Sequence, residues 1–88
     1  MFASSEIITA DKDFSERFVK NFVEQIKNIR PLVYIETTNK DRRANAKSVL
    51  GILSLQIKKG DKYKFVLMQP DIAPKDEVNQ VLEIFKNV

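Results

Sequence analysis

The side chains of this chain that could do chemistry are hydroxyls, carboxylates and amines, because none of its 88 residues is a cysteine or a histidine. Without cysteine, the sequence offers no disulfide, no thiolate ligand for a metal and no thiol nucleophile. Without histidine, it offers no imidazole to act as a general base or to carry a phosphoryl group. The acidic residues lack the spacing of a Mg²⁺ or Ca²⁺ site, and two glycines are too few for a phosphate-binding loop. We therefore expect no metal, no cofactor and no enzymatic activity.

Two serines occupy positions that suit modification or binding, because Ser15 and Ser48 each stand at the start of a segment with helical spacing. A serine at a helix start accepts a hydrogen bond from a backbone N–H, and a phosphate placed there would meet the same donors and the positive end of the helix dipole. For Ser15 a helix cap is the simpler interpretation, and a contact residue in a binding face or a phosphorylation site are the alternatives. Asp13 and Glu16 could instead form a capping box at this helix start. For Ser48 a cap and a phosphorylation site are compatible interpretations.

The elements that position these serines follow from the apolar spacing. Apolar residues at three- and four-residue steps predict a helix over 15–28, and β-branched and aromatic residues predict a strand over 32–38. The remaining predictions are strands over 5–9, 42–45 and 62–67, a turn at 39–41, a helix over 46–55 and a last helix that starts at the end of the loop 70–75 and has Val78, Val81, Leu82 and Phe85 on its apolar face. The order β-α-β-β-α-β-α predicts an α+β open-faced sandwich, with a four-stranded antiparallel sheet and three helices on one face. We expect residues 1–88 to form a single domain.

Charge and hydropathy favour a soluble, cytoplasmic protein. The net charge is +3, and the longest apolar run, residues 49–53, is far too short to cross a bilayer. The first residues show no signal peptide, so we expect no membrane association. The basic residues Arg42, Arg43, Lys58, Lys59, Lys62 and Lys64 could form a nucleic-acid surface. They are not interleaved with exposed aromatic residues, because Tyr63 and Phe65 are expected to point inward, so a solvated face is the preferred interpretation.

Two segments resemble a known family. Residues 45–60 read Asn-Ala-Lys-Ser-Val-Leu-Gly-Ile-Leu-Ser-Leu-Gln-Ile-Lys-Lys-Gly and resemble the regulatory-serine segment of HPr, the small phosphocarrier of the bacterial sugar phosphotransferase system. Residues 13–18, Asp-Phe-Ser-Glu-Arg-Phe, fall where HPr has Gly-hydrophobic-His-x-Arg-Pro. Length, element order and apolar spacing are similar along most of the chain, with an apparent short insertion near 39–43. The resemblance places Ser15 at the position of the family histidine and keeps Arg17.

The resemblance implies an HPr-like fold in a protein without a catalytic residue, similar to the catabolite-repression paralogue of HPr. A serine phosphate ester has a much lower transfer potential than a phosphohistidine, so Ser15 cannot relay a phosphoryl group. Asp13 and Glu16 also flank the position and disfavour a further dianion. The resemblance implies instead that Ser48 is a regulatory phosphorylation site. It names HPr kinase/phosphorylase and a catabolite-control transcription regulator as candidate partners.

A partner-binding surface is predicted around the second helix. Ile52 and Leu55 are expected to face the core, which leaves three apolar side chains to project outward. The predicted partner-binding residues are Arg17, Lys47, Val49, Leu50 and Leu53. Ordinary packing of the apolar residues is the alternative. Two other functions stay open: a diverged HPr-fold domain that binds an unrelated partner without a switch, favoured by the changes at Asp13, Glu16 and Phe18, and a basic nucleic-acid-binding domain.

Overall fold

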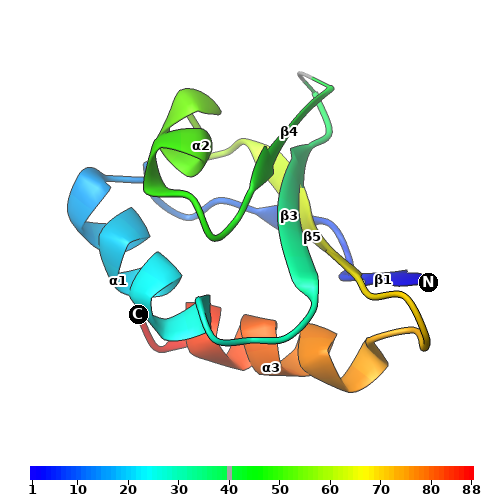
Figure 1. Ribbon diagram of the computed structural model, residues 1–88. Helices are drawn as coiled ribbons and strands as arrows, with labels where there is room; N and C mark the ends of the chain where they lie inside the picture. The colour runs from blue at the N-terminus through cyan, green and yellow to red at the C-terminus, as the bar shows by residue number, and fades with distance from the viewer. Residues whose placement is uncertain (40) are drawn as a thin grey trace.

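The computed structural model describes residues 1–39 and 41–88 and shows three helices against one face of an antiparallel sheet (Figure 1). Lys40, within the turn predicted at 39–41, lies outside the described residues. The elements in chain order are β1 (Phe2–Ser4), β2 (Ile8–Thr9), α1 (Glu16–Ile26), β3 (Leu32–Thr37), β4 (Arg42–Asn45), α2 (Val49–Ser54), β5 (Lys62–Met68) and α3 (Lys75–Lys86). The predicted fold class, an open-faced α+β sandwich with an antiparallel sheet, is confirmed.

Among the described residues the sheet has five strands where four were predicted, because the first strand is divided. Strands β1, β5, β3 and β4 lie in that order, and β2 also pairs with β5. The single strand predicted over 5–9 is wrong: β1 and β2 are separate short strands. The cause is Ser5, whose hydroxyl accepts a hydrogen bond of 2.9 Å from the backbone N–H of Phe65. The side chain thus takes the place of a backbone acceptor, as serine often does, and the ladder is interrupted there.

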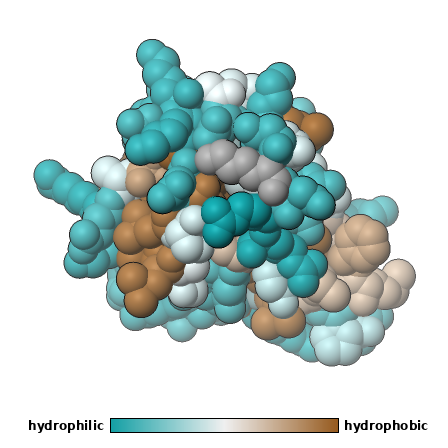
Figure 2. Space-filling model, turned by 90° about the horizontal axis from the view of Figure 1, so that it is seen from above, coloured by the Kyte–Doolittle hydropathy of each residue, from teal (hydrophilic) through white to brown (hydrophobic). Residues whose placement is uncertain are grey.

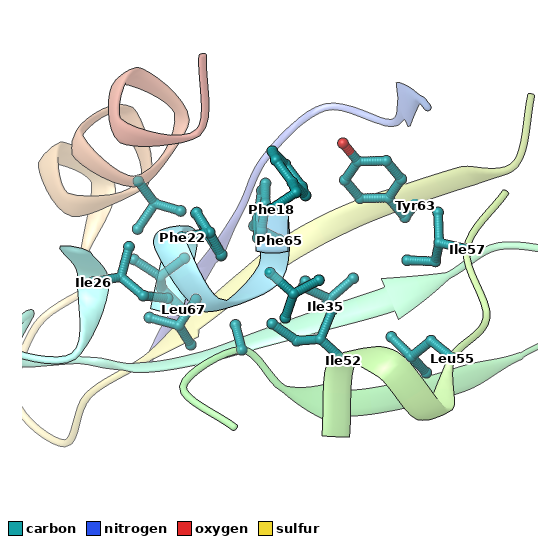
Figure 3. Packing of buried hydrophobic residues seen from close by; sticks show 14 of the residues in the cluster. Phe18, Phe22, Ile26, Ile35, Ile52, Leu55, Ile57, Tyr63, Phe65 and Leu67 are labelled. Carbon is teal, nitrogen blue, oxygen red and sulfur yellow. The ribbon is translucent and has the colours of Figure 1, made fainter. Parts of the chain in front are cut away.

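The core lies between the sheet and the helices (Figure 3). On β5, Tyr63, Phe65 and Leu67 point inward and are at most 1% exposed, as the alternation of the sequence predicts. Helix α1 covers them with the apolar face that its spacing predicts, of which Phe22 and Ile26 are fully buried. These residues join one hydrophobic cluster with side chains from α2, β3 and α3.

Phe85 of α3 joins the aromatic side chains of the core. Its ring centroid lies between 5.4 and 6.0 Å from those of five neighbours, which are Phe14, Phe18, Phe22, Tyr63 and Phe65. Most of these pairs meet edge to face, the arrangement that the charge distribution of aromatic rings favours by about 0.5–1.5 kcal/mol per pair. The C-terminal helix is therefore held against the loop and helix that carry Ser15.

Two helices are shorter than predicted. Helix α1 begins after Ser15 and ends at Ile26, two residues before the predicted 15–28 segment does. Helix α2 begins at Val49, directly after its cap Ser48, because the turn residue Ala46 is still bonded to β3: its backbone N–H donates a 2.7 Å hydrogen bond to the carbonyl of Val33. In the part of the chain that the structure describes, no helix has the length and apolar character needed to cross a membrane.

Burial of Tyr63 predicts a loss of stability at alkaline pH. Burial raises the pKa of the Tyr63 phenol well above its usual 10.0, and the carboxylate of Asp11 raises it further. A raised folded-state pKa contributes stability that is fully present below the unfolded-state pKa and is lost as the pH rises through the folded-state value. We therefore expect the free energy of unfolding to fall as the pH rises above about 10.

Urea unfolding of the wild type and of Tyr63→Phe at a series of alkaline pH values measures this loss. The variant keeps the ring but has no phenol to ionise, so its stability should fall less steeply over the same range. If the free energy of unfolding fell equally steeply with pH in both proteins, the loss of stability at alkaline pH would come from groups other than Tyr63.

Candidate functional site

Ser15 caps helix α1. Its backbone is extended, with φ −76° and ψ 159°, and its hydroxyl oxygen accepts a 3.2 Å hydrogen bond from the backbone N–H of Phe18. Of the two capping arrangements that the sequence left open, the structure therefore has the one centred on Ser15. The residue is exposed at the surface, but its hydroxyl is engaged in satisfying the first turn of the helix.

The loop that leads into Ser15 is tied to the turn before β5. The carboxylate of Asp13 accepts a 2.8 Å hydrogen bond from the backbone N–H of Lys59, and the N–H of Phe14 donates to the carbonyl of Ile57 at 3.0 Å. Gly60 donates to the carbonyl of Ala10 at 2.8 Å from a backbone with φ +94°, a conformation that favours glycine. These bonds hold the loop in place, and they give Asp13 a structural role that its sequence position did not reveal.

The charges around Ser15 are arranged differently from the expected pair of repelling carboxylates. Glu16 forms an ion pair of 2.8 Å with Lys20, one helical turn further on. The hydrogen bond from Lys20 and its charge lower the pKa of Glu16, and the same contact raises the pKa of Lys20. Arg17, a predicted partner-binding residue, has neither a hydrogen bond nor an ion pair among the described residues. Its guanidinium is available to a binding partner.

Ser48 caps helix α2 in the same way as Ser15 caps α1. Its hydroxyl oxygen accepts a 3.0 Å hydrogen bond from the backbone N–H of Gly51. A Cβ atom on Gly51 would lie 3.2 Å from both the Cβ and the Oγ atoms of Ser48, tighter than most real contacts. The glycine, which costs a helix up to about 1 kcal/mol, therefore leaves room for the cap. Its position three residues after Ser48 is the sequence signal for this role.

Lys47 does not extend beside Ser48, where a partner-binding residue was predicted. Its ammonium group donates to the backbone carbonyl of Ile29 and, at 3.0 Å, to that of Pro31. Burial lowers the pKa of Lys47. The side chain thus fastens the segment before α2 to the loop between α1 and β3.

Of the three apolar side chains that were expected to project outward, only Leu50 does so fully, with 80% of its surface exposed. Val49 and Leu53 are half-buried and pack against the core. Residues three and four positions apart share a helix face, so Val49 and Leu53 lie on the side of Ile52, which is buried as predicted. Figure 2 shows a hydrophobic patch over α2, bordered by hydrophilic side chains.

The predicted site residues thus fall into two groups. Helices α1 and α2 pack against each other, which brings the elements that carry Ser15, Arg17, Ser48 and Leu50 into one part of the molecule (Figure 1). Lys47 faces the α1–β3 loop instead. Within residues 1–39 and 41–88, no group of three or more acidic side chains is placed to hold a metal ion.

The fold and the site are those of a small α+β protein that presents two serine-capped helix starts near its surface. The family model that matches residues 4–85 is PTS-HPr, described as the PTS HPr component phosphorylation site. The chain therefore belongs to the HPr family, the phosphocarrier proteins of the phosphotransferase system.

Solved structures of HPr proteins share the fold at low sequence identity. The phosphocarrier protein HPr from Bacillus anthracis str. Ames is 21% identical, with a TM-score of 0.73 over 96% of this chain and 92% of that chain. HPr-C-His from Thermoanaerobacter tengcongensis is 20% identical, with a TM-score of 0.70 over 99% and 92%. The histidine-containing phosphocarrier protein of Mycoplasma is 17% identical, with a TM-score of 0.68 over 99% and 89%. No curated protein matches the chain.

Proposed function

We propose that this chain is a regulatory, protein-binding HPr-like domain over residues 1–88 that does not relay phosphoryl groups. The observation that carries the proposal is Ser15. By the resemblance of residues 13–18 to the family motif it falls at the position of the histidine, its hydroxyl caps α1, and none of the 88 residues is a histidine that could replace it. A phosphoryl group on a serine oxygen is an ester, which does not pass its group on as a phosphohistidine does.

Regulation by phosphorylation at Ser48 is the second part of the proposal. A kinase would move the γ-phosphoryl group of ATP to the Ser48 hydroxyl oxygen, which loses its proton, and ADP would leave. The added charge would arise where the backbone N–H of Gly51 already points at the Ser48 oxygen. The surface that a partner binds would also include Leu50, which is two residues away and 80% exposed, and Arg17, which is unpaired among the described residues.

Incubation with HPr kinase/phosphorylase and ATP, followed by peptide mass spectrometry, tests the switch. We expect one phosphoryl group, located on Ser48 and absent from Ser48→Ala. Ser54 is the matched control because it is exposed and lies in the same helix, so Ser54→Ala should be labelled like the wild type. No label on the wild type, or a label that survives in Ser48→Ala, would rule out the switch and leave the binding role to be tested separately.

The role of Lys47 favours a second candidate function, an HPr-fold domain that binds an unrelated partner and has no switch. The ammonium group next in sequence to Ser48 is held by the carbonyls of Ile29 and Pro31, so it is not placed to receive a phosphate on that serine. Asp13 is likewise committed to the backbone of Lys59. An unlabelled Ser48 together with recovery of a single partner, lost in Leu50→Asp, would support this candidate.

A further inference from the structure

The face of the sheet that points away from the helices is a second exposed surface, separate from the helix side that carries Ser15 and Ser48. Side chains alternate along each strand, so the register between strands defines which residues share this outer face. Phe2 of β1 lies opposite Met68 of β5, and Met68 lies opposite Leu32 of β3. These three residues, the outer apolar row, cross three neighbouring strands.

The outer apolar row is exposed although its side chains are large and apolar. The exposed fractions are 66% for Phe2, 38% for Met68 and 54% for Leu32. Val66, two residues before Met68, is only 8% exposed yet does not belong to the core cluster, because it lies on this side of the sheet. The outer face therefore carries apolar side chains that are not part of the core.

A hollow of about 380 Å³ adjoins the outer apolar row. Its lining combines apolar side chains with a few polar groups and consists of Met1, Arg30, Leu32, Met68, Gln69 and Pro70. The guanidinium of Arg30 lies 3.4 Å from the carboxylate of Asp71, and both side chains are largely exposed. The hollow therefore offers room for an apolar side chain beside a charged pair at the surface.

The other end of the outer face is positively charged. Arg43 lies 3.8 Å and Lys64 3.9 Å from the single carboxylate of Glu36, and Arg43 also stacks over the ring of Tyr34 at 4.3 Å. Lys62, two residues before Lys64 on β5, shares this face and is exposed. On the described strands, the outer face thus carries three cations against one carboxylate.

We propose that the outer face binds an acidic amphipathic helix of a partner protein, with its apolar side chains on the outer apolar row and its carboxylates on the basic end. Charge complementarity selects this occupant, because a second copy of the chain would bring the same excess of cations. Four residues along β3 separate Leu32 from Glu36, which is about 13 Å. The same distance is about nine residues of a helix, so the carboxylates should lie two to three turns away from the apolar residues.

Two synthetic helical peptides test the proposal. One carries leucines on one face in its first turns and glutamates two to three turns later, and the other has lysines in place of the glutamates. Each is titrated into ¹⁵N-labelled protein. We expect the acidic peptide to shift backbone amides of β1, β3 and β5, and to bind at least about tenfold more tightly than the basic peptide.

Variants of both surfaces show which face binds. The double variant Leu32→Ser/Met68→Ser and the charge reversal Lys64→Glu should each weaken binding of the acidic peptide by about tenfold or more, while Leu50→Ser on α2 should leave it unchanged. This control separates the proposal from the function assigned to Ser48. Absence of binding, equal affinity for both peptides, or shifts over α1 and α2 would overturn it. So would tighter binding to phosphatidylglycerol vesicles than to the acidic peptide, or self-association that Leu32→Ser abolishes.

Discussion

Replacing Phe65 by alanine is expected to lower the free energy of unfolding by about 3–5 kcal/mol. Phe65 is completely buried on β5, and its ring lies 5.4 Å from that of Phe85 and 5.7 Å from that of Phe22. The substitution removes these contacts and leaves a cavity where α1 and α3 meet the sheet. Such a loss is a large share of the roughly 5–15 kcal/mol that stabilises a typical small domain.

Phe2→Ala is the matched control, because Phe2 is the same residue type at 66% exposure on the outer face. It should change the free energy of unfolding by no more than about 0.5 kcal/mol. Urea titrations followed by circular dichroism measure both values. Comparable losses for the two variants would contradict the assignment of the core to the helix side of the sheet.

Replacing Leu50 by aspartate should abolish most binding to a partner that reads α2. Leu50 is the most exposed large apolar residue among the described ones, and a buried apolar anchor typically supplies 2 kcal/mol or more, roughly thirtyfold in affinity. Stability should be unchanged within about 0.5 kcal/mol, because the side chain lies outside the core and an acidic residue in the first turn suits the helix dipole. Isothermal titration with HPr kinase/phosphorylase gives the affinity.

Leu32→Asp tests whether the effect belongs to α2. Leu32 is also leucine and also exposed, at 54%, but it lies on the outer face of the sheet. Its substitution should leave affinity for this partner unaltered. If both variants bind like the wild type, α2 is not the docking surface; if both lose affinity equally, the loss has a cause other than Leu50.

The elements with strong periodicity could be predicted from the sequence. Alternation on β5 correctly placed Tyr63 and Phe65 inside, and three- and four-residue steps gave the buried face of α1. The same rule, applied to the short α2, would have placed Val49 and Leu53 with Ile52 rather than outward. The expectation was wrong because the face that a helix turns to the core is broad, about 100° or more, and here it includes Val49 and Leu53 as well as Ile52.

Other features depended on contacts between distant residues and could not be predicted. The side chain of Lys47 reaches carbonyls sixteen and eighteen positions earlier, and Asp13 bonds a backbone amide forty-six positions later. The break between β1 and β2 arises because the hydroxyl of Ser5 replaces a backbone acceptor for Phe65. No local sequence pattern predicts these hydrogen bonds, because they form only where the fold brings distant parts of the backbone close to the side chain.

The structure changes the electrostatic account of Ser15 while leaving the chemical one in place. Asp13 and Glu16 do not face the serine as two free carboxylates, because one bonds the backbone of Lys59 and the other pairs with Lys20. Repulsion between charges is therefore only a weak argument for the proposal that the protein does not relay phosphoryl groups. The stronger argument for that proposal is that a phosphoryl group on the Ser15 hydroxyl would be an ester, whereas an imidazole would form a transferable phosphoramidate.

The proposal that this protein does not relay phosphoryl groups is tested most directly by incubating it with phosphoenolpyruvate and the first enzyme of the phosphotransferase system. Intact-protein mass spectrometry then measures whether a phosphoryl group has been added. A histidine-containing HPr serves as the positive control and should gain one phosphoryl group in the same mixture. We expect this protein to gain none. A phosphoryl group that appears on the protein and then passes to a downstream acceptor would contradict it.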